Sequence, residues 1–495
     1  MPFLRKLLLI PKAVRQLGRG PLLLYVRYQI KLRSGILRMQ TPRGARKNIG
    51  DFELREVIRP ANKEKIKELL GKRVDELFAE ADEIFNGQVR LFGTASRKLE
   101  LSLAGQLEHW THYHSQMPDG TDIKPIWEAG RFGWATVLAR AYWLSGEERF
   151  AEGFWKFTEQ FLADNPPNKG PHWSSAQEVA LRLISLAFWY SLVADSVAST
   201  SERKQRLVQS VIAHAERIPP TLDYARAQNN NHLLSEALGL CTAAALLPDH
   251  PKATRWNELG RKYFFEGIES QIHEDGSYAQ HSANYHRLML QLSLWANKLL
   301  KEMPLPVATK LARSTDWLLT LLDEESGRVP NLGPNDGAYI LPLSVQAFED
   351  YRPALQAASL AFRGGSALAN GIWDEMALWF GIDPAGQRRD IENGPIRIEG
   401  KNSWAYLRAA QFQERPGHAD QLHLDLWWRG LNIAQDAGSY LYTAPQPWDN
   451  ALTSARVHNT LTVSGREPMT RAGRFLWLDW AQGKVVSAKK TDLEN

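Results

Sequence analysis

The amino-acid sequence predicts two structural parts in succession, a helical part followed by an antiparallel β part. From about residue 63 to residue 381, apolar residues recur at spacings of three and four. After about Gly386, short runs rich in aromatic and β-branched residues alternate in period two. The length agrees, because 495 residues exceed what one compact hydrophobic core usually holds.

Eight stretches of the first part have the helical period, and Pro or Gly residues punctuate the connections between them. They are 66–85, 127–144, 174–193, 202–217, 232–247, 256–272, 288–301 and 307–322. Ser174 and Ser175, followed by Gln177 and Glu178, predict a capping box for the third of these helices. We therefore expect a helical domain over residues 51–385, almost entirely α-helical between residues 63 and 381.

Five runs of the second part read as strands, and glycines break them at turn-like intervals. They are 395–399, 404–412, 422–428, 461–464 and 475–480. We expect an antiparallel β domain over residues 386–495. Because only about a hundred residues remain for it and no closing element is apparent, we also expect the full β domain to be longer than the sequence given.

Residues 1–50 form a separate basic segment, with 12 Lys and Arg and no Asp or Glu. The remaining residues carry 48 basic and 55 acidic side chains, which removes the main support for nucleic-acid binding. The apolar patches at 7–10 and 21–26 are too short to span a bilayer, and no recognisable signal cleavage site follows the first. Two interpretations stay open: an arm or helix packed on the main body, or peripheral contact with an anionic membrane surface. The compartment of this bacterial-type protein stays open between a cytoplasmic and a membrane-associated location.

Composition narrows the chemistry further. Hydrophobic residues make up 44% and charged residues 23%, as in ordinary globular proteins, which argues against a disordered or fibrous chain. A single cysteine, Cys241, excludes a disulfide scaffold and any metal or redox site built on paired cysteines.

Two polar clusters lie among the predicted helices. Asn229, Asn230 and Asn231 precede His232 at a helix start, where Asn is a common cap but a histidine would have its pKa lowered by the helix dipole. Residues 274–286 contain two Tyr, two His, Gln, Ser and Asn within nine positions, including Tyr285 and His286. A purely structural loop does not need this density of hydrogen-bonding groups, so a functional loop is the favoured interpretation.

A third cluster lies in the β part. His418, Asp436 and His458 are suitable ligands for a tetrahedral zinc ion with one open position. Their separations of 18 and 22 residues are not a local metal-binding signature, so ordinary turn and strand-end roles stay open.

Together these clusters resemble the heparinase II/III family of polysaccharide lyases. Asn-Asn-His-Leu-Leu-Ser-Glu-Ala at 230–237, Asp-Gly-Ser-Tyr followed by Ser-x-Asn-Tyr-His at 275–286, and Gly-His-Ala-Asp-Gln-Leu at 417–422 carry the resemblance. Further matches at 122–128, 173–182 and 457–460 keep the family order. The resemblance implies an incomplete α/α toroid followed by an antiparallel β-sandwich domain. It also implies β-elimination on a uronic-acid-containing polysaccharide, for example in exopolysaccharide metabolism.

The resemblance also implies residue roles. Asn231 would neutralise the substrate carboxylate, Tyr285 would act as base or acid, and His232 would assist, with His286 as a further candidate. His418, Asp436 and His458 resemble the family's zinc ligands.

One position departs from the family pattern. Pro416 stands where active members usually carry a second histidine, and His423 or His286 could substitute for it. A glycan-binding or polysaccharide-assembly protein without catalysis is therefore one alternative. A glycoside hydrolase, which needs two carboxylates across the site, is another, with candidates Glu128, Glu178, Asp275 and Asp336. The sequence does not fix the oligomeric state.

Overall fold

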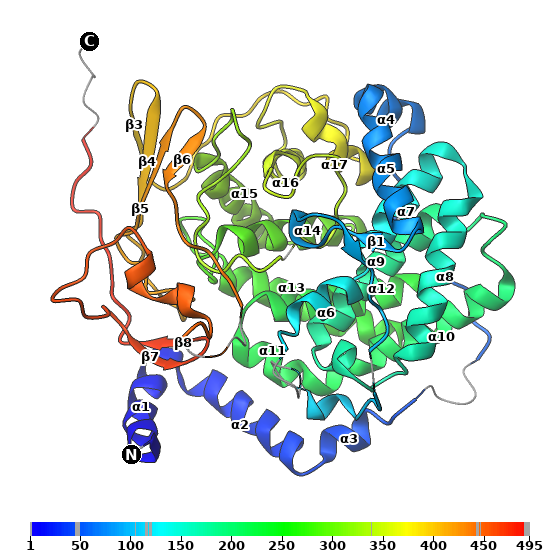
Figure 1. Cartoon of the computed structure of the whole chain (residues 1–495), viewed down its shortest axis with the longest axis horizontal. Coiled ribbons are helices and arrows are strands. Elements are labelled where there is room, and N and C mark those ends of the chain that lie inside the picture. The colour runs from blue at the N-terminus through cyan, green and yellow to red at the C-terminus, as the bar shows by residue number, and fades with distance from the viewer. Residues whose placement is uncertain are drawn as a thin grey trace.

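The computed structural model describes residues 2–489 except 45–49, 104, 114–116, 118–120, 338, 442–444 and 446. The first part consists mainly of helices, with an outer set packed around an inner set (Figure 1). In chain order the main helices are α4 (Lys63–Leu70), α5 (Val74–Phe85), α6 (Lys124–Gly130), α7 (Gly133–Ser145), α8 (Glu148–Asp164), α9 (Ala176–Val193), α10 (Ser201–Arg217), α11 (Leu222–Gln228), α12 (Asn231–Leu246), α13 (Ala253–Gln271), α14 (Ala283–Leu299), α15 (Leu305–Thr320), α16 (Arg352–Ala358) and α17 (Glu375–Trp379).

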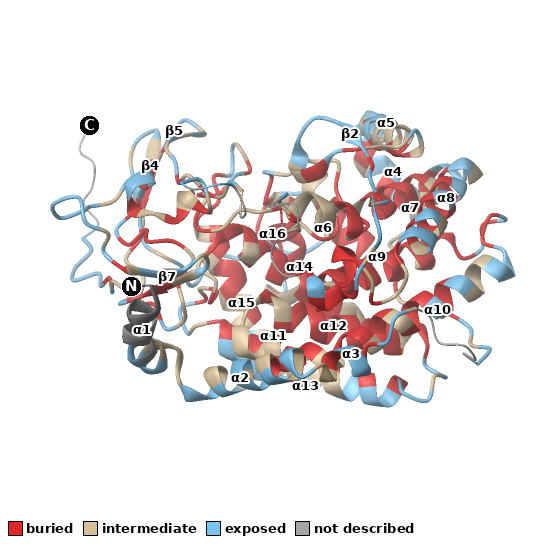
Figure 2. Cartoon of the chain, turned by 60° about the horizontal axis from the view of Figure 1, so that its bottom comes forward, coloured by how far each residue is buried: buried red, intermediate tan, exposed pale blue. Residues whose placement is uncertain are grey.

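Burial separates inner from outer helices. Almost every residue of α9 and α12 is buried, whereas α13 buries mainly one stripe that includes Trp256, Phe264 and Ile268 (Figure 2). An inner helix contacts neighbours on all sides and needs apolar residues all round, while an outer helix needs one apolar face. Gly260 marks the contact of α12 with α13, because a Cβ there would lie 2.5 Å from the Ala237 carbonyl oxygen.

The helical prediction is confirmed in outline and wrong in two details. The expected helix over 66–85 divides at Gly71, whose φ is +51°, and the one over 127–144 divides at Phe132, whose φ is +65°. The expectation of almost continuous helix between 63 and 381 also fails. Most of the described residues within 91–123 and 323–351 have no regular secondary structure, and β1 (Gln88–Val89) pairs with β2 (Arg97–Lys98). The apolar residues of these loops do not recur at spacings of three and four, so the helical pattern does not extend through them.

The second part contains a four-stranded antiparallel sheet in the order β3-β4-β5-β6. Its strands are β3 (Arg397–Glu399), β4 (Ser403–Leu407), β5 (Leu424–Trp428) and β6 (Leu431–Ala434), and a separate ribbon pairs β7 (Thr470–Gly473) with β8 (Leu476–Leu478). The prediction of an antiparallel β part is confirmed, but the run at 461–464 forms only an isolated bridge between Val463 and Arg466. The last six residues, 490–495, lie outside the described residues.

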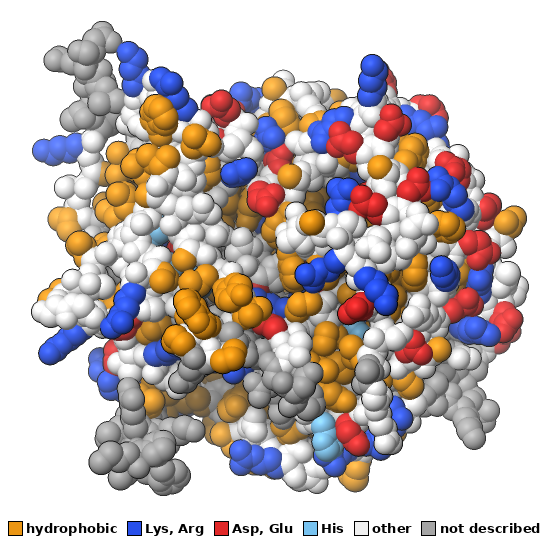
Figure 3. Space-filling model, in the orientation of Figure 1, with side chains coloured by type: hydrophobic (Ala, Val, Ile, Leu, Met, Phe, Trp, Pro, Cys, Tyr) orange, Lys and Arg blue, Asp and Glu red, His pale blue; other side chains and the backbone are white. Residues whose placement is uncertain are grey.

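The two faces of this sheet differ. Trp404 stacks on Trp427 at 5.2 Å and both are buried, whereas Trp428, Leu431 and Ile433 on the other face are exposed. Figure 3 shows hydrophobic side chains gathered over these strands at the upper left. One sheet face therefore belongs to the core and the other lies open.

The basic N-terminal segment forms three helices along one edge of the molecule (Figure 1). They are α1 (Pro2–Leu17), which contains the apolar patch 7–10, α2 (Arg19–Arg33) and α3 (Ile36–Gln40). Helix α2 packs on α11, with the Tyr28 and Tyr224 rings 4.8 Å apart, and Lys12 of α1 pairs with Asp479 beside β8 at 2.6 Å. The segment therefore contacts both the helical and the β part. Among the described residues, no helix is long and apolar enough to cross a membrane.

Candidate active site

The three consecutive asparagines have three separate positions. Asn229 ends α11 in the left-handed conformation, with φ +44°, and its side-chain oxygen accepts from Ser270 Oγ at 3.1 Å. Asn230 caps α12, because its Oδ1 accepts the His232 backbone N–H at 3.1 Å. Asn231 is the first helical residue, and its side chain is buried. Within the described part of the chain, the Asn231 Nδ2 group has no hydrogen-bond partner. A buried amide that neither caps nor pairs is available for a ligand.

His232 lies beside Asn231 with its side chain half-buried. Burial lowers the pKa of His232 to about 4, and the cations Arg415 and Arg131 lower it further against the opposing charge of Glu178. The direction agrees with the prediction from the helix dipole, although burial is the larger cause. His232 is therefore a neutral imidazole at neutral pH.

Tyr285 does not lie in a loop, as the sequence suggested, but in the first turn of α14. Ser282 caps this helix, because its Oγ accepts the Tyr285 backbone N–H at 3.1 Å. The Tyr285 hydroxyl donates to Asp336 Oδ2 at 2.9 Å. Burial and then the Asp336 carboxylate raise the pKa of Tyr285 well above its ordinary value, so the phenol keeps its proton at neutral pH.

A charged cluster that the sequence did not predict as a unit joins these residues. Arg131, which follows α6, donates to Glu178 through Nε and Nη2 at 2.6 and 2.9 Å, and to Glu128 through Nη1 at 2.6 Å. Both His232 and Tyr285 are within electrostatic reach of Arg131 and Glu178. Burial raises the pKa of Glu128 to about 7, against the attraction of Arg131. The cluster therefore places His232 and Tyr285 around one centre.

The structure differs from two predictions about individual residues. The predicted capping box at 174–178 is absent, because the Ser175 hydroxyl makes no cap hydrogen bond and Glu178 binds Arg131 instead. The His286 ring points away from the site, into the contact between α14 and α15. Its Nε2 lies 2.6 Å from Ser314 Oγ, and its ring stacks on Trp317 at 5.4 Å. The hydrogen bond to Ser314 and the stacking on Trp317 therefore turn the His286 ring away from Tyr285, which faces Asp336.

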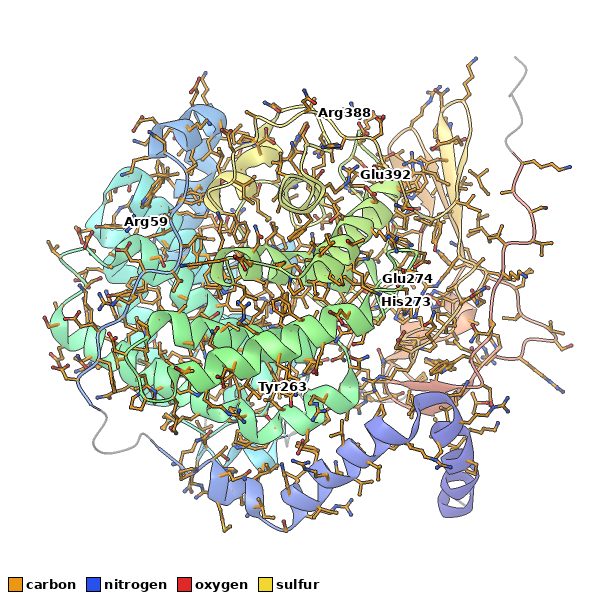
Figure 4. All side chains as sticks on the ribbon, turned by 180° about the vertical axis from the view of Figure 1, so that it is seen from behind. Arg59, Tyr263, His273, Glu274, Arg388 and Glu392 are labelled. Atoms are coloured by element: carbon orange, nitrogen blue, oxygen red, sulfur yellow. The ribbon has the colours of Figure 1, made fainter. Side chains whose placement is uncertain are left out.

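The segment 414–417 of the β part closes on the same site from the other side. Glu414 Oε2 lies 2.7 Å from Nε2 of His273, which follows α13 and is labelled beside Glu274 in Figure 4. The Arg415 guanidinium donates to the side-chain oxygen of Gln228, at the end of α11. Gly417 lies against Pro334, where a Cβ would approach to 2.8 Å. The site therefore lies between the helical and the β part.

The predicted metal ligands converge. One ligand atom from each of His418, Asp436 and His458 lies within 4.8 Å of the others, and all three residues are buried. His458 Nδ1 is 3.2 Å from Asp436 Oδ2, and the His418 and His458 rings are 5.2 Å apart. Residues from three separate segments thus meet although their spacing in sequence gave no local signature. The convergence is confirmed, while the identity of a metal stays a prediction.

The chemistry of these residues fits a zinc ion. Burial lowers the pKa of His418 to about 4, so its ring is neutral, as a ligand must be. Burial opposes protonation of His458 too, but Asp436 raises its pKa overall. Among the described residues, Nδ1 of His418 and Nε2 of His458 have no hydrogen-bond partner, and His458 Nδ1 and Asp436 Oδ2 have none besides their contact with each other. Four such atoms at one buried place suit a cation, and two histidines with one carboxylate are a common zinc set.

His423 is a neighbour of this cluster. Its Nδ1 accepts the Asn459 backbone N–H at 3.1 Å, and its Nε2 lies 3.6 Å from Asp425 and 3.9 Å from Asp436. Because Nδ1 is used as an acceptor, Nε2 carries the proton in the neutral ring. His423 therefore faces the carboxylates as a donor.

The carboxylates proposed for a glycoside hydrolase are already engaged. Glu128 and Glu178 share Arg131, and Asp336 holds Tyr285. Asp275 accepts from Ser277 in the turn that follows α13. This arrangement does not favour the hydrolase alternative.

Sequence comparison assigns both parts of the chain to one family. The model of the heparinase II/III N-terminus matches residues 95–312, and that of the heparinase II/III-like C-terminal region matches residues 394–494. A heparin-sulfate lyase of Bacteroides stercoris is 26% identical over 413 residues, covering 74% of this chain and 58% of the relative. One of Pedobacter heparinus is 25% identical over 399 residues, covering 75% and 57%. The chain thus spans less than three fifths of either relative.

The fold also has a solved counterpart. A crystal structure of heparinase III superposes with a TM-score of 0.55 at 15% identity, covering 90% of this chain and 70% of that one. At this identity the likeness concerns the fold, a helical toroid followed by β structure.

Proposed function

Because the chain belongs to the heparinase II/III family, we propose that it is a polysaccharide lyase that cleaves a uronic-acid-containing polysaccharide by β-elimination. The observation that carries the proposal is that neutral His232 and protonated Tyr285 both lie within electrostatic reach of Arg131 and Glu178. Next to His232 in the chain, Asn231 has a buried amide without a hydrogen-bond partner among the described residues. The names of the relatives, which are heparin-sulfate lyases, support an acidic polysaccharide as substrate.

The proposed reaction removes the proton on the carbon next to the uronate carboxylate and breaks the bond to the neighbouring glycosidic oxygen. Asn231 Nδ2 donates to the carboxylate, where negative charge grows as the proton leaves. His232 has a free lone pair at neutral pH and takes the proton as base. Tyr285 still carries its proton and gives it to the departing oxygen, which leaves a double bond in the sugar.

Asp336 and Arg131 act on these groups indirectly. Asp336 fixes the orientation of the Tyr285 hydroxyl through their 2.9 Å hydrogen bond. Arg131 balances Glu128 and Glu178, so the buried cluster is not left with two uncompensated carboxylates.

The experiment that tests the proposal follows ultraviolet absorbance while the protein acts on a panel of uronic-acid polymers. Only a lyase creates the conjugated double bond, so absorbance should rise with the chain breaks. New reducing ends without a gain in absorbance would instead indicate a hydrolase. Binding without any chain break would indicate a glycan-binding protein.

We also propose that His418, Asp436 and His458 hold a zinc ion. When bound, the ion would supply a fixed positive charge that ties three segments of the β part together. The proposed roles of Asn231, His232 and Tyr285 do not require it.

The N-terminal segment supports a further proposal, peripheral contact with an anionic membrane through the outer face of α2. Leu23, Val26 and Ile30 lie on this face and are 69%, 51% and 59% exposed. Their spacing of three and four places them in one stripe, and Arg19 and Arg33 flank it. An apolar stripe beside basic residues is the pattern of helices that lie in a bilayer interface.

Vesicle sedimentation tests this contact. The protein should bind vesicles that contain phosphatidylserine more strongly than pure phosphatidylcholine vesicles, and salt should weaken the binding. Leu23→Ser with Ile30→Ser should abolish it. Leu431→Ser is the matched control, because Leu431 is 58% exposed on the open sheet face. A loss of binding only in this control would contradict a role for α2.

A further inference from the structure

Arg415 is a cation with little to neutralise it. Its side chain is half-buried, and burial lowers its pKa, opposed by the nearby Tyr224 phenol. Its recorded hydrogen bond is to the neutral side chain of Gln228. Across the described ranges of the chain, no carboxylate lies within ion-pair distance of Arg415. A guanidinium has five N–H donors, so the remaining ones are open to water or to a ligand.

Four fully buried arginines of this protein each have several partners. Arg131 and Arg140 pair with glutamates, whereas Arg182 and Arg217 each donate to two backbone carbonyls and one side chain. Removing a charge from water without a partner is unfavourable. Arg415 therefore differs from these residues in having few protein partners, and an anionic ligand would supply the missing ones.

The position of Arg415 points to the same site. Its charge lowers the pKa of His232, so it lies within electrostatic reach of that ring. Tyr224, which it also faces, has its ring 6.2 Å from the His232 ring. An anion held by Arg415 would thus lie beside the proposed catalytic base.

The chain holds Arg415 in place before any ligand arrives. On one side, Glu414 binds His273. On the other, Pro416 restricts the backbone of Arg415 to extended conformations, Gly417 packs on Pro334, and His418 enters the metal cluster. A pre-positioned fork loses little freedom on binding a carboxylate or sulfate.

We propose that Arg415 binds an anionic group of the polysaccharide, either a uronate carboxylate or a sulfate ester, and thereby sets the requirement for a charged substrate. This inference rests on the proposed lyase function for its ligand. It also gives the segment around Pro416 a role in holding the substrate.

The first test needs no catalysis. Thermal unfolding is measured for the wild type, Arg415→Gln, Arg415→Lys and Arg466→Gln with sodium sulfate and with sodium glucuronate, each against sodium chloride at equal ionic strength. Low millimolar concentrations are used, because sulfate stabilises proteins non-specifically at higher ones. Arg466 is an exposed arginine of the β part and serves as the matched control. At least one anion should raise the Tm of the wild type and of Arg466→Gln. The rise should be absent in Arg415→Gln and reduced in Arg415→Lys, which keeps the charge but not the fork.

The stability without anion separates ligand binding from a structural role. Arg415→Gln should unfold at the same temperature as the wild type or higher, because it removes an uncompensated charge. A marked fall in this Tm, or an anion-dependent rise that persists in Arg415→Gln, would overturn the proposal.

Kinetics on sulfated and unsulfated uronate polymers identifies the anion. Arg415→Gln should raise KM about 10- to 100-fold, with a smaller change in kcat, on the polymer whose group it binds. An unchanged KM on every cleaved polymer would also overturn the proposal. If the wild type forms no unsaturated product but its Tm rise still depends on Arg415, the lyase function fails and the anion site stands.

Discussion

At the scale of single residues, Tyr285 and Asn231 are the sharpest test of the mechanism. Tyr285→Phe removes the hydroxyl that donates to Asp336 and keeps the ring, so folding should survive while the rate of elimination falls by at least about 100-fold.

Asn231→Ala should lower kcat more than it raises KM, because the amide acts on charge that develops during the reaction. Product absorbance measures both rates. Full activity of Tyr285→Phe on a confirmed substrate would remove Tyr285 from the mechanism.

The protonation states of His232 and Tyr285 predict the pH dependence. The pKa of His232 is lowered to about 4 and that of Tyr285 is raised well above 10, so both groups keep their working forms across neutral pH. We expect no decline of kcat/KM from protonation of the base near pH 6.5, where an ordinary histidine base would lose activity. Any change between about pH 6 and pH 8 should instead follow Glu128, whose pKa burial raises to about 7 in the same cluster. A decline of kcat/KM near pH 6.5 that persists in folded Glu128→Gln would contradict His232 as the base.

The free energy of unfolding should also depend on pH below about 6.5. Burial lowers the pKa of His172 and His214 to about 3 and that of His286 to about 4, so unfolding allows each ring to take up a proton below about pH 6.5. Because the unfolded state then binds more protons, these three histidines should make the free energy of unfolding fall as pH drops from about 6.5 towards 4. Burial raises the pKa of Glu128 and Glu236, so these two carboxyls act in the opposite direction and reduce the fall. Urea unfolding at several pH values measures this.

At the scale of elements, the start of α12 separates a structural asparagine from a functional one. Asn230→Ala removes the cap that binds the His232 N–H and should lower the free energy of unfolding by about 1 kcal/mol. Asn231→Ala leaves this cap intact and should lower the free energy of unfolding less, although the substitution should reduce activity. If Asn231→Ala destabilised the protein as much as Asn230→Ala, the amide of Asn231 would have a structural role after all.

The same helix shows what the sequence can predict. The apolar pattern located α12 to within one residue at each end, because a helix buried on all sides is apolar throughout. The start of α14 was missed, since its first turn contains Asn284, Tyr285 and His286, which resemble a polar loop. Only the side-chain cap from Ser282 reveals it, and one serine is a weak signal.

Residues of the candidate site that lie in sequence motifs could be predicted. Residues whose side-chain contacts come from distant segments could not. Asn231, His232 and Tyr285 were predicted with roles, whereas Arg131 and Arg415 were not. Each of these arginines gains its significance from contacts across tens or hundreds of residues, with Glu178 and Gln228 respectively. A single sequence contains no pattern that pairs such positions.

At the scale of the whole molecule, the helical and β parts meet through the residues that surround the site. Asn335 N–H donates to Ser439 Oγ at 3.0 Å, and Gly438 lies so close to Asn331 that a Cβ would approach its Nδ2 to 2.4 Å. Gly438 also donates to Asp436 Oδ1 at 2.8 Å. The loop that carries Asp336 is therefore in contact with the segment that carries a proposed metal ligand.

This connection predicts that metal removal acts on the site from a distance. A chelator should lower the Tm by about 3 °C or more, because zinc binds the folded arrangement of His418, Asp436 and His458 and not the unfolded chain. It should also raise KM, since His418 anchors the segment that carries Arg415. His458→Ala removes one ligand, so its lower Tm should no longer respond to the chelator. Asn331→Ala keeps all three ligands and should retain the response. Equal responses of the wild type and His458→Ala, or a purified protein without metal, would refute the zinc site while leaving the roles of Asn231, His232 and Tyr285 intact.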